Sequence, residues 1–167
     1  PYSLSKAVWD MLTQSYAKTY WLNTLITRSS NNYGPNQNFI SLIPKFIQKI
    51  YNNEALTLHG DWSHIRDWLY VTDHCDAIWN AFMNAPNNSI YNISSNNLLS
   101  NLKVTQSILK EFQKDDSCIS FIPDVPGNIK TCAINTSTKI QQELNWEPKI
   151  DFAQGIQKTI ESYNKYL

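Results

Sequence analysis

Tyr2 and Lys6 are the residues whose types and spacing most directly suggest chemistry. They stand four positions apart at the start of a stretch with helical periodicity, and on a helix such residues lie on one face about 6 Å apart. A lysine ammonium beside a phenol favours the phenolate, so the phenol can exchange a proton with a substrate hydroxyl. The pair therefore predicts an acid/base device. The alternative is a surface tyrosine beside a solvated lysine, because YxxxK spacing alone is common.

A polar stretch, residues 29–37, supplies the second group of candidates. It follows an apolar, β-branched run that predicts a buried parallel strand over residues 22–28. Open α/β sheets bind ligands beyond the carboxyl ends of their strands. The amides of Asn31 and Asn32 would suit a polar ligand such as a sugar or a nicotinamide carboxamide. The alternative is a loop whose Asx turns satisfy its own polar groups.

Three further side chains could contact a ligand. Arg66 offers a planar fork of donors that matches phosphate oxygens, although it could also form a surface pair with Asp67, which we expect to be a structural partner. His59 could stack on a ring, but a single histidine is more often structural. Asn101 precedes a helical stretch, where it could equally serve as the N-cap.

The elements that must position these residues alternate along the chain. Thr72 is the predicted N-cap of one helix, with Asp73 in its first turn, and Pro44 is compatible with the first turn of another. Helix and strand in alternation predict an α/β fold. The predicted helices cover residues 3–20, 42–51, 73–84, 102–112, 137–144 and 152–166, and the predicted strands cover residues 22–28, 56–60, 65–71, 90–93 and 118–122.

Composition narrows the class of ligand and the compartment. The 167 residues are 42% hydrophobic, enough for one domain with a sizeable core, and 14 basic residues balance 14 acidic ones. With no basic run, neither a nucleic acid nor a membrane surface is indicated as a partner. Three cysteines without CxxC spacing argue against a disulfide framework or a metal site. We therefore expect a cytoplasmic protein that binds a small ligand.

Several ordered blocks of the sequence together resemble one family. In chain order they are PYSLSKA, ITRSSNNYGPNQ, LIPKFI, LTLHGD, IRDWLYVTDH, IYNISSNN, ELNWEP and GIQKTIESY. They are similar to the nucleotide-sugar dehydratases of the extended short-chain dehydrogenase/reductase group, in particular dTDP-glucose 4,6-dehydratase. The resemblance implies the C-terminal part of a Rossmann-type parallel sheet plus a small α/β substrate-binding domain, with the substrate-binding parts mainly at residues 31–67 and 94–167.

The resemblance also implies a reaction with NAD as cofactor. Tyr2 would take the proton from the sugar C4 hydroxyl as the C4 hydride passes to NAD, and Lys6 would bind the nicotinamide ribose. Asn32 would contact the cofactor and Asn31 the substrate. Water would then be eliminated across C5 and C6 of the sugar, and the hydride would return to C6.

Four more residues take substrate-side roles by the same likeness. Arg66 and Asn101 would hold the nucleotide diphosphate or the sugar, and His59 would lie near the base. Asn128, the last residue of Asp-Val-Pro-Gly-Asn, stands where the family has Asp-Arg-Pro-Gly-His and is expected to contact the substrate.

The family's glycine-rich dinucleotide fingerprint and its Thr-Asp-Glu set are not in this sequence and would lie before Pro1. We therefore expect the C-terminal half of such an enzyme, poorly active or inactive in isolation, with a homodimer as the full-length form.

Departures from the family pattern leave the substrate and the activity open. Val125 replaces an arginine expected near the phosphates, which would cost about 1.5–3 kcal/mol of binding. Ser94 and Ser95 replace a Gly-Gly pair, and Ser41 replaces a common lysine. A dTDP sugar is the first expectation and a UDP sugar the second. The alternatives in function are a nucleotide-sugar 4-epimerase and a non-catalytic remnant that binds a nucleotide sugar.

Overall fold

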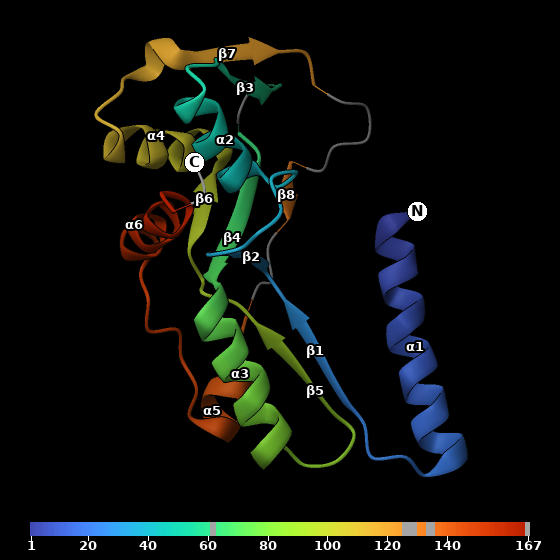
Figure 1. Cartoon of the computed structure of the whole chain (residues 1–167). Helices are drawn as coiled ribbons and strands as arrows, with labels where there is room; N and C mark the ends of the chain where they lie inside the picture. The colour runs from blue at the N-terminus through green and yellow to red at the C-terminus, as the bar shows by residue number, and fades with distance from the viewer. Residues whose placement is uncertain (61–62, 125–129, 133–135, 166–167) are drawn as a thin grey trace.

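The computed structural model describes residues 1–60, 63–124, 130–132 and 136–165, in which helices and strands alternate (Figure 1). The helices are α1 (Tyr2–Tyr20), α2 (Leu42–Tyr51), α3 (Val71–Asn84), α4 (Asn101–Glu111), α5 (Thr138–Leu144) and α6 (Phe152–Tyr163). The strands are β1 (Leu25–Ser29), β2 (Asn31–Tyr33), β3 (Leu56–His59), β4 (Ile65–Tyr70), β5 (Ser89–Ile93), β6 (Leu98–Ser100), β7 (Ile119–Ile122) and β8 (Thr131–Cys132). The expected α/β class is confirmed.

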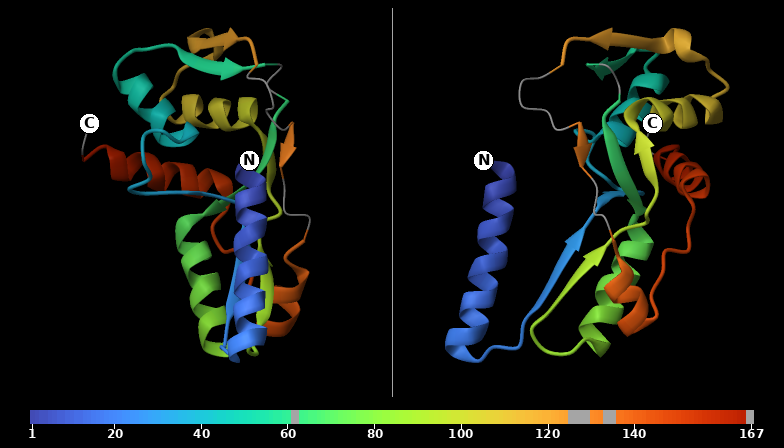
Figure 2. Two further views of the ribbon diagram at one scale, coloured as in Figure 1. Left: turned by 90° about the vertical axis from the view of Figure 1, so that its right-hand side faces the viewer. Right: turned by 180° about the vertical axis from the view of Figure 1, so that it is seen from behind.

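Strands β1 and β5 form a parallel pair that lies between helices. Helix α1 runs along one face of the pair, and α3 and α5 cover the other face (Figures 1 and 2). The covered face contributes Tyr91 and Ile93 to a core that also includes Ala77 and Ala81 of α3 and Ile140 of α5. This part of the molecule ends, at the carboxyl edge of β1, in the polar stretch that leads to β2.

Strand β4 organises the second part of the molecule. It pairs in parallel with β2 and β8 and antiparallel with β6, while β3 and β7 form a separate parallel pair. Helices α2, α4 and α6 gather around these strands (Figure 1). Their shared core includes Tyr33, whose hydroxyl donates a hydrogen bond to the Phe152 carbonyl. Tyr33 lies so close to Gly155 of α6 that a Cβ there would collide with its hydroxyl.

A buried carboxylate ties the two parts together. Asp73 in the first turn of α3 is 3% exposed, and its Oδ2 accepts hydrogen bonds from the backbone N–H groups of Lys149 and Ile150 at 3.0 and 2.9 Å. These residues lead into α6. The position of α6 relative to α3 is therefore held by a charge-assisted pair of hydrogen bonds.

Several predicted boundaries and caps were wrong. The first strand begins at Leu25 rather than Leu22, because Thr24 exchanges hydrogen bonds with Asn88 at the turn before β5. Helix α3 begins at Val71, so Thr72 lies inside it and is not the N-cap. Ser100, and not Asn101, caps α4, since its hydroxyl accepts a hydrogen bond from the Lys103 backbone N–H.

Other differences concern short strands and helix ends. The polar stretch contains β2, which was not predicted. Strands β6 and β8, which are three and two residues long, were not predicted either. The predicted strand over 118–122 starts at Ile119, because Cys118 belongs to a 3-10 turn. Helix α6 ends at Tyr163 instead of residue 166. Pro44 lies in the first turn of α2, as expected.

The apolar residues of α1 are largely exposed. Its helical periodicity was predicted correctly, yet Ala17 is its one buried residue. Leu4, Trp9 and Met11 are 69%, 65% and 70% exposed. The helix is therefore fastened to the rest of the described chain by specific polar contacts rather than by a broad apolar face.

Candidate functional site

One open cleft collects most of the predicted site residues. It has a volume of about 1050 Å³ and lies between α1 and the loops and strands at the carboxyl end of β1. Its lining includes six of the predicted residues: Tyr2, Lys6, Asn31, Asn32, Arg66 and Asn101. They come from four different elements, α1, β2, β4 and α4, so the fold brings residues 2 and 101 of the chain to the same cavity.

The predicted geometry of the Tyr–Lys pair is confirmed. Both side chains project from the first turns of α1 and line the cleft, and Lys6 Nζ lies 5.5 Å from the centre of the Tyr2 ring. Tyr2 is 74% exposed, so a ligand can reach its hydroxyl. Tyr33, by contrast, lies in the core, where burial raises the pKa of its phenol. Tyr2 is therefore available for proton exchange in a way that Tyr33 is not.

An ion pair missed by the sequence analysis holds α1 at the cleft. Arg28 Nε donates to Asp10 Oδ2 at 2.6 Å, and both residues line the cavity. Asp10 follows Lys6 by four positions, as Lys6 follows Tyr2, so all three lie on one helix face. That spacing could have identified Asp10. The partner could not have been identified, because Arg28 is 18 residues away on β1.

The amides on the far wall retain unpaired acceptor atoms. Asn32 Nδ2 donates to Ser29 Oγ at 3.4 Å, while Asn32 Oδ1 is buried and has no partner among the described residues. Ser30 also lines the cleft, and its Oγ is likewise buried with no hydrogen-bond partner among the described residues. Buried polar groups are usually hydrogen-bonded. These atoms fit a ligand that offers N–H or O–H groups, such as a nicotinamide carboxamide or a sugar.

Arg66 and Asn101 reach the cleft from the β4 side. The Arg66 guanidinium donates to the carbonyl oxygens of Ile65 and Lys130 at 2.8 and 3.3 Å. Asp67 is buried, and its Oδ1 accepts a hydrogen bond from the Ser95 hydroxyl at 2.6 Å. Asp67 is therefore not part of a surface pair, and its Oδ2 is buried with no partner among the described residues. The Asn101 backbone N–H donates to the His64 carbonyl, which fixes the start of α4 at this wall.

Two predicted residues are not placed at the cleft. His59 ends β3, is exposed, and has its Nδ1 3.4 Å from the Pro123 carbonyl oxygen, but it is not part of the cleft lining. Asn128 and the substituted Val125 lie outside the described residues. The structure therefore groups six of the predicted residues and leaves His59 apart.

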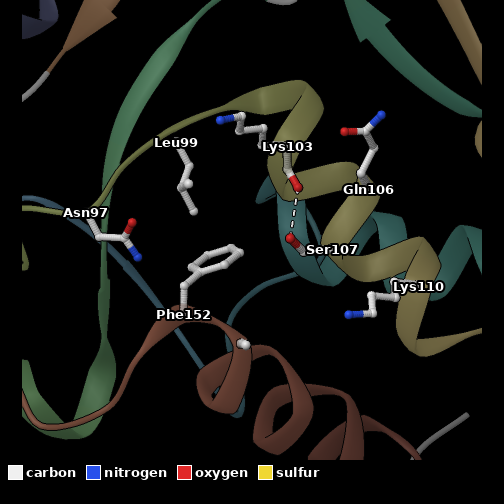
Figure 3. A pocket seen from close by; sticks show the side chains of 8 residues that line it. Asn97, Leu99, Lys103, Gln106, Ser107, Lys110 and Phe152 are labelled. Carbon is white, nitrogen blue, oxygen red and sulfur yellow. Dashed lines mark hydrogen bonds between the residues drawn. The ribbon is translucent and has the colours of Figure 1, made fainter.

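A second, smaller cavity of about 420 Å³ lies between α4 and α6 (Figure 3). Leu99 and the Phe152 ring form its apolar part, and Lys103 and Lys110 of α4 flank it (Figure 3). As far as the described residues show, its lining contains no tyrosine, no carboxylate and none of the predicted residues that the structure places. The cleft beside α1 is therefore the candidate active site.

Within the ranges given above, no group of three or more His, Cys, Asp or Glu side chains is arranged to hold a metal ion. Nor does any helix in those ranges combine the length and apolarity needed to traverse a lipid bilayer.

Comparison with known proteins decides the family. Residues 1–159 match the family described as GDP-mannose 4,6 dehydratase. The chain belongs to this family. It is 38% identical over 172 residues to dTDP-glucose 4,6-dehydratase of Xanthomonas campestris pv. campestris, covering 98% of this chain and 49% of that protein. A low-salt glycan biosynthesis protein of Haloferax volcanii is 42% identical over 164 residues, covering 98% of this chain and 52% of the relative.

Solved structures of the family agree with the fold. Bacillus anthracis dTDP-glucose 4,6-dehydratase, in complex with NAD, matches with a TM-score of 0.93 and 41% identity over 99% of this chain and 52% of that one. UDP-glucose 4-epimerase from Thermotoga maritima, with UDP-glucose, matches with a TM-score of 0.92 and 25% identity over 99% and 54%. The chain spans about half the length of the curated relatives it matches. Of these two solved structures, the dTDP-glucose 4,6-dehydratase is more similar in sequence to this chain than the epimerase, at 41% against 25% identity.

Proposed function

We propose that this chain carries the Tyr–Lys half of a nucleotide-sugar 4,6-dehydratase site that acts on dTDP-glucose with NAD. The observation that carries the proposal is the grouping of Tyr2 and Lys6 in one cleft with Asn31, Asn32 and Arg66. Such a cleft offers a proton acceptor, cationic groups and neutral amides, which are the groups that a phosphorylated sugar requires. The relatives named above support dTDP-glucose over a UDP sugar.

Each residue has a physical task in this mechanism. Tyr2 in its phenolate form receives the proton of a sugar hydroxyl and becomes the neutral phenol. The Lys6 ammonium beside the ring stabilises the negative charge that the phenolate oxygen carries before this transfer. The Arg66 guanidinium attracts the diphosphate. Asn31 and Asn101 orient the sugar with neutral hydrogen bonds.

The described residues fit the nicotinamide end of NAD. The unpaired Asn32 Oδ1 can accept from an amide N–H, and the Lys6 ammonium can donate to ribose hydroxyls in the same cleft. When bound, NAD supplies a hydride acceptor. The sequence has four glycines and no glycine-rich phosphate loop, so the proposed cofactor contacts of this chain are those of Tyr2, Lys6 and Asn32.

The two parts of the fold would have different tasks, one in the sheet and the other in substrate binding. Strands β1 and β5 with α3 would form the end of a Rossmann-type sheet, and residues 31–67 and 94–167 would supply most of the substrate-binding surface. We also include a homodimer in the proposal. The exposed Leu4 and Met11 of α1 fit a helix that another polypeptide surface covers.

A second candidate is a nucleotide-sugar 4-epimerase, which uses the same Tyr–Lys chemistry without loss of water. One observation favours it: the solved structure of UDP-glucose 4-epimerase from Thermotoga maritima has the same fold, with a TM-score of 0.92 over 99% of this chain. A third candidate is a protein that binds a nucleotide sugar without turnover.

Product analysis tests the proposal. The protein as its gene encodes it would be incubated with dTDP-glucose and NAD, and the products identified by mass spectrometry and NMR. A 4-keto-6-deoxy product that has lost one water supports the dehydratase. A galactose isomer of unchanged mass supports the epimerase, and unchanged dTDP-glucose that nevertheless binds supports the non-catalytic alternative.

A further inference from the structure

Four buried polar atoms in the wall of the cleft have no hydrogen-bond partner among the described residues. They are Ser30 Oγ, Asn32 Oδ1, Gln37 Oε1 and Trp68 Nε1. Native structures rarely keep a buried polar atom unpaired without a functional reason, because its lost hydration is not replaced. Unpaired buried atoms also occur outside the cleft lining, on Asp67 and Trp146, but the four at the cleft are the ones that the polar groups of a bound ligand could pair with.

Gln37 has the best-defined orientation of the four. Its Nε2 donates a hydrogen bond to the backbone carbonyl oxygen of Asn32 at 2.9 Å. A carbonyl oxygen only accepts, so turning the Gln37 amide around would replace this bond with a contact between two oxygens. Gln37 Oε1 is thereby fixed as an acceptor at the cleft wall.

Trp68 supplies the complementary group. Its side chain is 6% exposed, and its ring packs against Tyr33 and Phe152 with centroid distances of 6.2 and 6.4 Å. The indole N–H can only donate. The packed ring holds that donor in a fixed direction. Two residues that line the cleft thus carry one acceptor and one donor without partners among the described residues.

This combination distinguishes the hexose of a nucleotide sugar from its diphosphate. A phosphate group only accepts hydrogen bonds, so it could pair with Trp68 but would leave Gln37 Oε1 unpaired. A hexose carries several hydroxyls, each of which donates and accepts. The hexose therefore matches this wall, while the diphosphate matches the cationic side of the cleft at Arg66 and Lys6.

We propose that Gln37 is a specificity-determining residue whose Oε1 accepts a hydrogen bond from a hydroxyl of the hexose. The inference rests on the proposed function, since it takes the ligand of this cleft to be a nucleotide sugar. It assigns to Gln37 the recognition of the sugar rather than of the nucleotide.

The test compares ligands with and without the hexose. Calorimetry would measure the affinities of dTDP-glucose, dTDP and NAD for the protein as its gene encodes it and for its Gln37→Leu and Gln157→Leu variants. Gln157 is an exposed residue of α6 outside the cleft lining and provides the matched control. Gln37→Leu is expected to weaken dTDP-glucose binding about tenfold and dTDP binding less than about twofold, because one hydrogen bond to the sugar is lost. Gln157→Leu should change neither affinity.

The other outcomes overturn the inference in distinguishable ways. Equal weakening of dTDP-glucose and dTDP would show that Gln37 only supports the loop, and an unchanged affinity for both would show that it contacts no sugar. Weakening confined to NAD would assign the acceptor to the nicotinamide carboxamide. In each of these cases the proposed function would stand. If the unmodified protein, as its gene encodes it, bound neither dTDP-glucose nor dTDP, the proposed function would fail and the inference with it.

Discussion

Arg28 Nε lies 2.6 Å from Asp10 Oδ2, and this ion pair joins α1 to β1 at the wall of the cleft. Few other contacts hold α1, since Ala17 is its one buried residue. The side chains are 48% and 24% exposed, so the pair contributes little to global stability. Its effect should instead fall on the position of the helix that carries Tyr2 and Lys6.

Breaking this pair should weaken ligand binding more than it weakens folding. Asp10→Asn is expected to lower the free energy of unfolding by less than about 1 kcal/mol and to weaken dTDP-glucose binding by about threefold or more, because α1 loses its anchor. Urea unfolding and calorimetry measure the two quantities. Asp76→Asn, which removes the exposed pair with Lys149, is the control and should leave binding unchanged. Equal binding by both variants would contradict a positioning role for Asp10.

Removing the Tyr2 hydroxyl should stop proton exchange without preventing binding. Tyr2→Phe in the protein as its gene encodes it is expected to lower product formation from dTDP-glucose by a factor of about 10² to 10⁴, with substrate affinity changed only a few-fold. Tyr20→Phe, at the other end of the same helix and 61% exposed, should retain full activity. Comparable rates for the two variants would remove Tyr2 from the chemistry.

Gly155 should not tolerate a side chain. The Cβ of Gly155→Ala would collide with the Tyr33 hydroxyl and press on the Tyr70 ring, which are both in the core. Such overpacking is expected to cost about 1–3 kcal/mol of unfolding free energy, measured by urea denaturation. Because the hydroxyl is the nearest atom, adding Tyr33→Phe should recover part of the loss. A double variant no more stable than Gly155→Ala would show that the clash lies elsewhere.

The free energy of unfolding of the chain should decrease in mild acid because the half-buried His74 imidazole resists protonation. Burial lowers the pKa of this half-buried imidazole from its ordinary value of 6.5. Between the unfolded and folded pKa values the unfolded chain binds more protons, so stability increases with pH. The contribution of His74 is complete above pH 6.5 and is lost as the pH falls through the lower, folded value. Urea midpoints measured across this range should decline less in His74→Gln than in the unmodified chain, and parallel declines would contradict this assignment.

The sequence predicted most of the long elements and the grouping of the site. Helical periodicity located α1, α2 and α4 because each repeats apolar residues over ten or more positions. Tyr2 and Lys6 could be paired from spacing alone, since a helix fixes the relation of i and i+4. Placing Asn31, Arg66 and Asn101 at one cavity followed from the family resemblance, and the cleft lining agrees with it.

The failures have a common physical origin in long-range contacts. Ser100 rather than Asn101 caps α4 because Asn101 donates its backbone N–H to His64, 37 residues earlier in the chain. Strands β6 and β8 are too short to show alternation and exist because β4 offers them an edge. The Asp10–Arg28 pair likewise depends on folding that brings α1 and β1 together, so it could not be derived from a local pattern.

The crystal structure of the protein bound to dTDP-glucose tests the central claim most directly. The account predicts the sugar C4 hydroxyl within about 3 Å of the Tyr2 hydroxyl, with the diphosphate on the Arg66 side of the same cleft. A nucleotide sugar bound between Lys103 and Lys110, or bound in the cleft with its hexose turned away from Tyr2, would contradict it.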